Sequence, residues 1–503
     1  MLFSQIVATS RDVGATRSRK VKVGALRKVL TRLEPSEVDP VVAWLSGELR
    51  QGRIGIGWRT VADIPAAPVD VGSVTVSEVD GTVSAVAEVT GPGSAVRRRE
   101  LLADLFSRTT TDERDFLIRL VTGDLRQGAL EGVMTDAIAA AADLPVEPVR
   151  RAFMLSGRLP ATAVAAFGGG VDALTAFRLE VGRPIRPMLA SPAESLADAW
   201  TELGGDVSVE YKLDGARIQV HRNGDEVRIF TRTLREITAS VPELVELVAG
   251  LPCTSAVFDG ETLALTDSGR PRPFQETMSR FGAESSRDLL LHPYFFDCLH
   301  LDGIDLLDAP LEQRLDALER VAPQHRIPGL IRPDSEGAAT HFDDALAAGH
   351  EGVMVKSLTA PYAAGRRGRA WQKVKPEHTL DLVVLGAEWG YGRRTGYLSN
   401  LHLGARDPDG GAPIMVGKTF KGLTDALLQW QTDEFPRHER RRDDHTVYLH
   451  PDLVVEIELD GVQVSSRYPG GLALRFARVL RYRPDKAAAD ADTIDAVRAL
   501  LPG

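Results

Sequence analysis

The residues best suited to chemistry lie in one short stretch, "EYKLDGAR", at 210–217. Lys212 stands between two runs, "VSVEY" and "IQVHR", that alternate apolar and polar residues as half-buried strands do. Gly215, between Asp214 and Arg217, is typical of a turn that joins two such strands. The pattern predicts that Lys212 ends one strand and Arg217 begins the next, so that their charges enter a shared space.

A lysine in this setting could act as a nucleophile. The amine must be neutral to attack, and an ordinary lysine, with a pKa of ~10.4, is almost fully protonated at neutral pH. Apolar flanks and nearby cations favour the neutral amine, and a bound metal ion acts in the same direction. The alternative, a structural lysine in a surface hairpin, stays open on this stretch alone.

Six further segments with charged or aromatic residues follow along the chain. In order they read "FTRTLREIT", "VFDGETLAL", "PYFFDCLHLDG", "HEGVMVKS", "RRGRAWQKVK" and "LRFARVLRYRPDK". Singly, each has an ordinary explanation, because an isolated carboxylate is usually solvated and an aromatic residue on a strand is usually core. The segments are informative about function only when they are taken together and in this order.

In this order the segments resemble the six motifs of the covalent nucleotidyltransferases. Within that superfamily the chain resembles ATP-dependent DNA ligases of the bacterial and archaeal type, whose catalytic core follows a helical DNA-binding domain. The N-terminal segment "TGDLRQGALEGVMTDAIAAA" is similar to part of that domain. The second motif departs from the usual S-R-N pattern, because Arg232 is flanked by Thr231 and Thr233.

The resemblance implies roles for individual side chains. Lys212 would attack the α-phosphate of ATP and carry AMP as a phosphoramidate. Glu351 would be the main metal ligand, and Glu261 and Asp214 would support it. Contacts to the nucleotide are implied for Glu210, Arg217, Arg232, Glu261, Phe296, Arg367, Lys373 and Lys375.

The resemblance also implies an enzyme that seals nicks in duplex DNA, with ATP and with Mg²⁺, or Mn²⁺ in its place, as cofactors. We expect a monomer that works at the nucleoid, in DNA replication, repair or recombination. The alternatives are an RNA ligase or capping-type nucleotidyltransferase, which lack a large helical N-terminal domain, and an inactive protein that binds nicks. An NAD-dependent ligase is disfavoured, because the two cysteines cannot form a four-cysteine zinc module.

Composition is compatible with a DNA partner in spite of a net charge of −10. Basic runs occur in three regions, such as "TRSRKVKVGALRKVLTR" near the N-terminus, which contains no acid. No stretch approaches the ~20 apolar residues of a membrane span, and the first residues do not have the pattern of a signal peptide. We therefore expect a cytoplasmic protein.

The periodicity of the sequence predicts three domains that would hold these side chains. Residues 1–182 have helical spacing, with a capping box at Thr110 and Glu113, although 65–98 suggests irregular structure or a hairpin. Residues 183–378, after a proline-rich linker, predict an α+β domain with antiparallel sheets. Residues 379–503 predict a small β-barrel of the OB type with one helix inserted.

Overall fold

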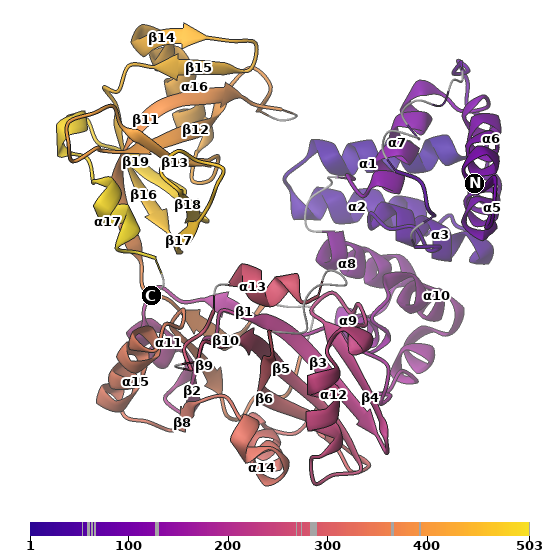
Figure 1. Cartoon of the computed structure of the whole chain (residues 1–503). Helices are drawn as coiled ribbons and strands as arrows, with labels where there is room; N and C mark the ends of the chain where they lie inside the picture. Colours follow the sequence, from indigo (N-terminus) through magenta and orange to yellow (C-terminus); the bar gives the residue numbers. More distant parts are fainter. Residues whose placement is uncertain are drawn as a thin grey trace.

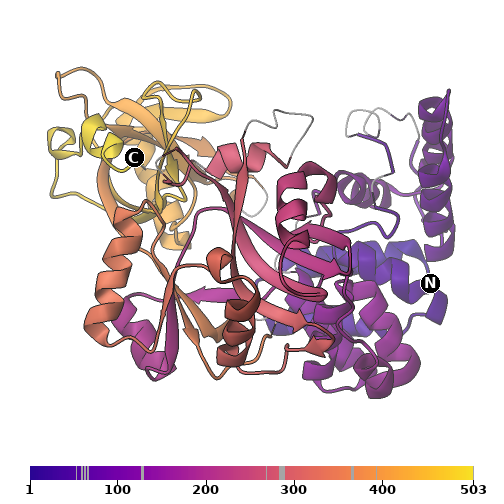
Figure 2. The ribbon, with the colours of Figure 1, turned by 60° about the horizontal axis from the view of Figure 1, so that its bottom comes forward.

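The computed structural model describes residues 1–501 except positions 53, 58–60, 62–63, 65–66, 126–129, 268, 273, 282–288, 364–366 and 392–393. The chain folds into an N-terminal helical region, a central region with two sheets and a C-terminal β-rich region (Figure 1). The first and last of these lie on either side of the short helix α13 of the central region (Figures 1 and 2). This arrangement confirms the predicted fold class.

As far as it is described, the N-terminal region consists of helices and the loops between them. The helices are α1 Phe3–Ala15, α2 Arg19–Leu30, α3 Pro35–Leu45, α5 Val76–Glu88, α6 Ser94–Phe106, α7 Thr111–Thr122, α8 Leu130–Ala142, α9 Val146–Ser156 and α10 Leu159–Thr175. They share one apolar core, in which Phe3 packs edge-on against Trp44 with ring centroids 5.6 Å apart. The similar segment "TGDLRQGALEGVMTDAIAAA" leads into α8 and lies partly outside the described residues.

The prediction for 65–98 was wrong, because this segment contains α5 and the start of α6. The N–H of Glu78 donates to the Thr75 hydroxyl, and the Glu78 carboxylate accepts from the Thr75 N–H, which is a capping box. The valines of this segment recur at helical spacing and form a buried face: Val76, Val79, Val83 and Val86. The capping box predicted at Thr110 and Glu113 is confirmed.

The central region has two five-stranded sheets. The first has the order β1-β10-β9-β2-β8, with β1 Leu189–Pro192, β2 Val207–Tyr211, β8 Gly329–Ile331, β9 Val353–Ser357 and β10 Arg367–Val374. The second has the order β4-β3-β5-β6-β7, with β3 Ala216–Asn223, β4 Glu226–Thr231, β5 Ser255–Ala264, β6 Leu291–Leu301 and β7 Ile304–Asp305. All pairs are antiparallel except β1–β10. The helices are α11 Leu196–Leu203, α12 Pro242–Ala249, α13 Phe274–Ser279, α14 Leu311–Val321 and α15 Ser335–Ala347.

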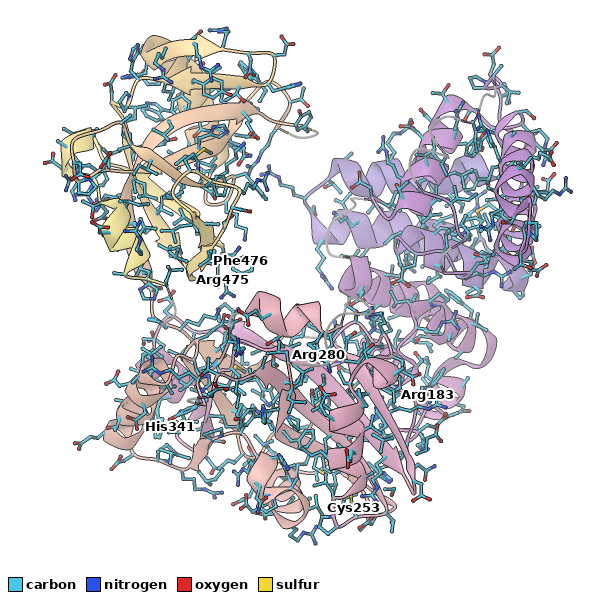
Figure 3. All side chains as sticks on the ribbon, in the orientation of Figure 1. Arg183, Cys253, Arg280, His341, Arg475 and Phe476 are labelled. Atoms are coloured by element: carbon cyan, nitrogen blue, oxygen red, sulfur yellow. The ribbon has the colours of Figure 1, made fainter. Side chains whose placement is uncertain are left out.

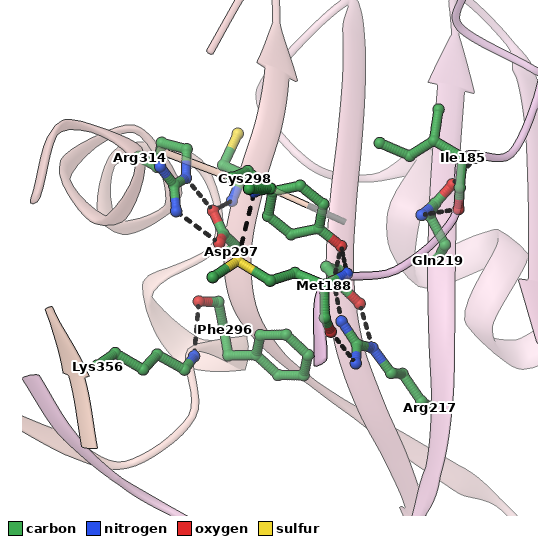
Figure 4. Close-up of polar contacts among 12 residues, drawn as sticks. Ile185, Met188, Arg217, Gln219, Phe296, Asp297, Cys298, Arg314 and Lys356 are labelled. Carbon is green, nitrogen blue, oxygen red and sulfur yellow. Dashed lines mark hydrogen bonds and ion pairs between the residues drawn. The ribbon is translucent and has the colours of Figure 1, made fainter. Parts of the chain in front are cut away.

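The proline-rich segment before β1 is packed against the second sheet. Alternate residues of β3 hold it through side-chain contacts: Arg217 donates to the Met188 carbonyl at 2.7 Å, Gln219 exchanges two hydrogen bonds with Ile185, and His221 accepts from the Gly182 N–H at 3.0 Å (Figure 4). Residues two positions apart on a strand face the same side of the sheet, so all three side chains point toward this segment. The predicted linker is thus an ordered part of the fold.

The C-terminal region consists mainly of hydrogen-bonded β-strands. Its strands are β11 His378–Trp389, β12 Leu398–Ala405, β13 Ile414–Thr419, β14 Glu439–Arg442, β15 Thr446–Leu449, β16 Val454–Leu459, β17 Gly461–Val464, β18 Leu472–Arg475 and β19 Arg478–Tyr482, and its helices are α16 Asp425–Glu434 and α17 Ile494–Arg498. β11 pairs with β12, β15 and β16, and β16 pairs with β19. A bridge between Lys421, just after β13, and Arg478 of β19 joins the two ends of the sheet. Within the described residues, no helix is both long and apolar enough to cross a membrane.

Candidate active site

A cavity of about 810 Å³ opens between the two central sheets and the C-terminal region. Every predicted site residue whose side chain is described lines this cavity. The exception is Arg367, which begins β10 and whose side chain lies outside the described part. The chain therefore gathers residues from position 189 to position 476 into one space.

Lys212 lies where the chain crosses from one sheet to the other. β2 pairs with β8 and β9, whereas β3 pairs with β4 and β5, so the turn 212–215 does not close a hairpin. Gly215 is required at this crossing, because a Cβ there would meet the Thr262 carbonyl at 2.5 Å. Lys212 is therefore not on a surface hairpin, because its side chain is only 20% exposed and lies inside the cavity.

Glu351 is the charge partner of Lys212. Its carboxylate contacts the Lys212 ammonium directly, accepts from Lys375 at 3.0 Å and lies 3.5 Å from Arg475. Burial by itself would raise the pKa of Glu351, but Lys212 and Lys375 outweigh it and lower that pKa to about 2. Two backbone hydrogen bonds fix the pair, from the Lys212 N–H to the Gly352 carbonyl at 2.8 Å and from the Glu351 N–H to the Lys212 carbonyl at 3.0 Å.

Glu261 differs from Glu351 in its protonation. It lies on β5 opposite Arg217 of β3. Burial raises the pKa of Glu261 to about 8, although Lys212 and Arg217 favour the charged form. At neutral pH it is therefore mostly a neutral carboxyl group, which suits a hydroxyl partner better than a metal ion.

The C-terminal region contributes charged groups to the cavity. Arg475 donates to both oxygens of Asp214, at 2.6 and 3.2 Å. Asp460 accepts from Lys375 at 3.1 Å. Figure 3 shows Arg475 and Phe476 at the edge of the C-terminal region that faces the central region. The ion pairs across this boundary leave Glu351 and Asp214 each bound to cations.

One wall of the cavity combines an ion pair with aromatic rings. The Lys356 ammonium contacts the Glu210 carboxylate, and both side chains are almost fully buried. It lies 4.4 Å from the centroid of Phe296 and 4.5 Å from that of Trp371. It also donates to the Phe296 carbonyl at 3.4 Å (Figure 4). This wall offers a flat apolar surface with a polar end, as a purine base requires.

Arg217 is held firmly beside this wall. It makes two hydrogen bonds to Asp259, at 3.0 and 2.6 Å, and Tyr362 donates to the same carboxylate at 2.7 Å. Burial by itself would lower the pKa of Arg217, but Asp259 and Tyr362 raise it above the ordinary value. Because its fork is occupied by Asp259 and the Met188 carbonyl, Arg217 supports the wall as well as lining it.

The remaining predicted residues lie at the mouth. Arg232 is exposed at the end of β4. Lys373 lies two residues before Lys375 on β10 and faces the same cavity, and burial, with Lys375 and Lys212 nearby, lowers its pKa. Sequence reasoning missed Asp460 and Trp371. Trp371 could have been predicted, because it lies two residues before Lys373 on the same strand and so faces the same side.

Two acids of the cavity could contribute to a divalent-cation site. In the part of the chain that is described, no three His, Cys, Asp or Glu side chains come together as a metal site. Mg²⁺ is usually held by one or two carboxylates, several waters and the phosphates of a substrate. Glu351 and Asp214, both bound to Arg475, fit that smaller contribution.

Comparison with known proteins gives matches over most of the chain. Residues 65–139 match the model "DNA ligase N terminus", residues 187–375 match "ATP dependent DNA ligase domain", and residues 394–486 match "ATP dependent DNA ligase C terminal region". A "Probable DNA ligase" of Rhodococcus opacus is 93% identical over 503 residues, and one of Nocardia farcinica is 67% identical over 523 residues, with all of each chain covered. The solved structure described as "Pmar-Lig_Pre" has a TM-score of 0.63 at 16% identity, and the match covers 95% of this chain and 99% of that one, so it is similar in fold.

Proposed function

Because the chain belongs to the family of ATP-dependent DNA ligases, we propose that the cavity around Lys212 is where it takes AMP from ATP and passes it to a nick in duplex DNA. The observation that supports this most is the Lys212–Glu351 contact, made inside a cavity whose other charged side chains are mainly cations. We propose the divisions 1–182, 183–378 and 379–503 as DNA-binding, adenylation and OB-type domains.

The first step makes a lysyl-AMP. The Lys212 amine attacks the α-phosphorus of ATP, the bond from that phosphorus to the bridging oxygen breaks, and pyrophosphate leaves with the electron pair. Lys212 gives up its ammonium proton to water before the attack, and the proton released as the phosphoramidate forms also passes to water. Lys373, Lys375 and Arg475 lie around the same space and would balance the charge of the triphosphate. Glu210, Phe296 and Lys356 would hold the base, and neutral Glu261 would donate to a ribose hydroxyl.

The partnership between Lys212 and Glu351 suits this step. The Glu351 carboxylate contacts the Lys212 side chain and so holds the nucleophile inside the cavity. A divalent cation, when bound, would supply positive charge to the phosphates, and Glu351 with Asp214 would be its protein ligands.

The next two steps use DNA. An oxygen of the 5′-phosphate at the nick attacks the AMP phosphorus, and Lys212 leaves. The 3′-hydroxyl then attacks the 5′-phosphate, forms the phosphodiester and releases AMP. The C-terminal region covers the cavity through Arg475 and Asp460 in the ligand-free chain, so it must move away for DNA to reach Lys212. We propose the segment around "KPEHTLDLV", 375–383, as the hinge, a monomer as the active form, and the nucleoid in the cytoplasm as its place of work.

Mass spectrometry after incubation with nucleotide tests this proposal. We expect ATP with Mg²⁺ to add the mass of AMP to Lys212, GTP to add nothing, and Lys212→Ala to add nothing. The adenylylated protein should then seal nicked duplex DNA without further ATP. AMP on another residue, or transfer to nicked RNA in preference to DNA, would contradict the assignment.

A further inference from the structure

Behind the strands that carry Lys212 and Glu351 lies a stack of three aromatic rings. The ring of Tyr211, the last residue of β2, lies 4.5 Å from the His341 ring at a tilt of 34°, and 5.3 Å from the His350 ring at 44°. His341 belongs to α15, and His350 follows that helix. Figure 3 shows His341 on the outer side of the central region, away from Arg475 and Phe476.

The stack is joined directly to the backbone of the reaction pair. Tyr211 immediately precedes Lys212, and His350 immediately precedes Glu351. The backbones of Lys212 and Glu351 are in turn hydrogen bonded to each other at 3.0 Å. A ring that is held in place restricts the backbone at the residue that follows it, and so restricts where the charged side chain begins.

Hydrogen bonds to backbone carbonyls also hold the stack in place. The Tyr211 N–H donates to the Pro328 carbonyl at 2.9 Å, and a ring nitrogen of His341 hydrogen bonds the same carbonyl. The His350 N–H donates to the Ala345 carbonyl at the end of α15, at 2.9 Å. Helix α15 and strand β2 thus hold the three rings in one position.

This arrangement has a cost that an ordinary apolar core would not have. Among the described residues, neither Nε2 of His341 nor Nδ1 of His350 has a hydrogen-bonding partner. A buried polar atom without a partner destabilises the fold by about 1–3 kcal/mol. Leucine side chains at these places would bury as much apolar surface without that cost, so the rings themselves are what the site requires.

We propose that Tyr211 and His350, supported by His341, are positioning residues for the adenylylation of Lys212. They set the position of the Lys212 amine relative to Glu351. This inference rests on the proposed role of Lys212. It predicts a defect confined to the steps in which Lys212 reacts.

Two reactions separate this role from a general structural one. The first is single-turnover formation of lysyl-AMP with labelled ATP over a range of ATP concentrations. The second is the sealing of a nick whose 5′-phosphate already carries AMP, a reaction in which Lys212 does not react. For Tyr211→Leu we expect lysyl-AMP formation to slow by at least ~10-fold, with half-saturation by ATP unchanged within about twofold. Sealing of the pre-adenylylated nick should be at least as fast as with Lys212→Ala.

The conservative variant and a matched control complete the design. Tyr211→Phe keeps the ring and should restore lysyl-AMP formation to within about threefold of the parent. Tyr448→Leu is the control, because Tyr448 lies on β15 of the C-terminal region and its ring also contacts a histidine, His402, at 6.1 Å. This control should form lysyl-AMP at the parent's rate.

Each outcome bears on the inference. A normal rate in Tyr211→Leu overturns it, and so does an equal loss of both reactions, which would indicate general damage. If Tyr211→Leu does not fold, His350→Ala is measured against the same criteria. If the parent itself forms no lysyl-AMP, the proposed function fails, which is a different result from a normal rate in the variant.

Discussion

Replacing Glu261 by glutamine should remove a pH-dependent loss of stability from the ligand-free protein. Burial raises the pKa of Glu261 to about 8 in the folded chain, from the ordinary value of 4.5, although Lys212 and Arg217 oppose the change. Between these two values the folded chain binds more protons at this position than the unfolded chain does. Stability therefore falls as the pH rises through this range.

The size of the effect follows from proton linkage. The contribution of protonated Glu261 is fully present below about pH 4.5 and is lost as the pH rises through about 8. Each pH unit in between removes about 1.4 kcal/mol of unfolding free energy. From about pH 5 to about pH 8 the parent should thus lose roughly 4 kcal/mol through this group. Glutamine is neutral over this whole pH range, so position 261 of the variant makes no pH-dependent contribution to the unfolding free energy.

Thermal melting of both proteins without nucleotide or divalent cation, at constant ionic strength, measures the difference. A change of 1 kcal/mol shifts Tm by about 2–4 °C for a domain of this size. We therefore expect the Tm of the parent to fall by roughly 8 °C or more beyond that of Glu261→Gln over this range. Glu319→Gln is the control, because Glu319 pairs with Arg326 at the surface and is 53% exposed. Parallel melting curves for parent and Glu261→Gln, or a steeper fall in the variant, would refute the reasoning.

Three other perturbations test the site and its support. Arg475→Ala removes both hydrogen bonds to Asp214, which are worth about 1.5–3 kcal/mol as charge-assisted bonds. Lysyl-AMP formation in single turnover should therefore slow by roughly 10- to 100-fold. An unchanged rate would mean that docking of the C-terminal region is not needed. Arg314→Met leaves the fully buried Asp297 without its partner and should lower the free energy of unfolding by about 3–5 kcal/mol in urea titration, and adding Asp297→Leu should recover most of it. Gly352→Ala places a Cβ 2.2 Å from a backbone carbonyl at φ +134°, so its Tm should fall by several degrees, and a Tm equal to the parent's would contradict the geometry.

Local signals in the sequence predicted local structure well. The capping box at Thr110 is an example, because its partners lie three residues apart and need no other part of the chain. The same signal at Thr75 was overlooked in a segment rich in valine and glycine, and α5 was missed as a result. The crossing at 212–215 was also predicted as a simple strand connection, because its flanks look alike although they pair in different sheets.

The meeting of distant residues at the site could be predicted only from the order of the motifs. Nothing in the spacing between Lys212 and Glu351, 139 positions apart, specifies a contact. The resemblance supplied that link, and the structure brings the two side chains together. Asp460 could not be predicted in this way, because its partner Lys375 belongs to another region and their contact depends on how the regions pack. The roles assigned to these residues stay predictions until the reactions are measured.

The two boundaries of the central region differ in their chemistry, and this difference indicates where the molecule moves. On the N-terminal side, Met154 and Leu155 of α9 share an apolar core with Val257 and Leu299 of the central sheets, so separation would expose buried apolar surface. On the C-terminal side, the described apolar core begins at Leu380, and the contacts across the boundary are ion pairs. Ion-paired side chains can exchange their partners for water and phosphate, whereas apolar side chains that leave a core have no such replacement. The N-terminal and central regions should therefore bind DNA as one body, and the C-terminal region should be the part that opens and closes.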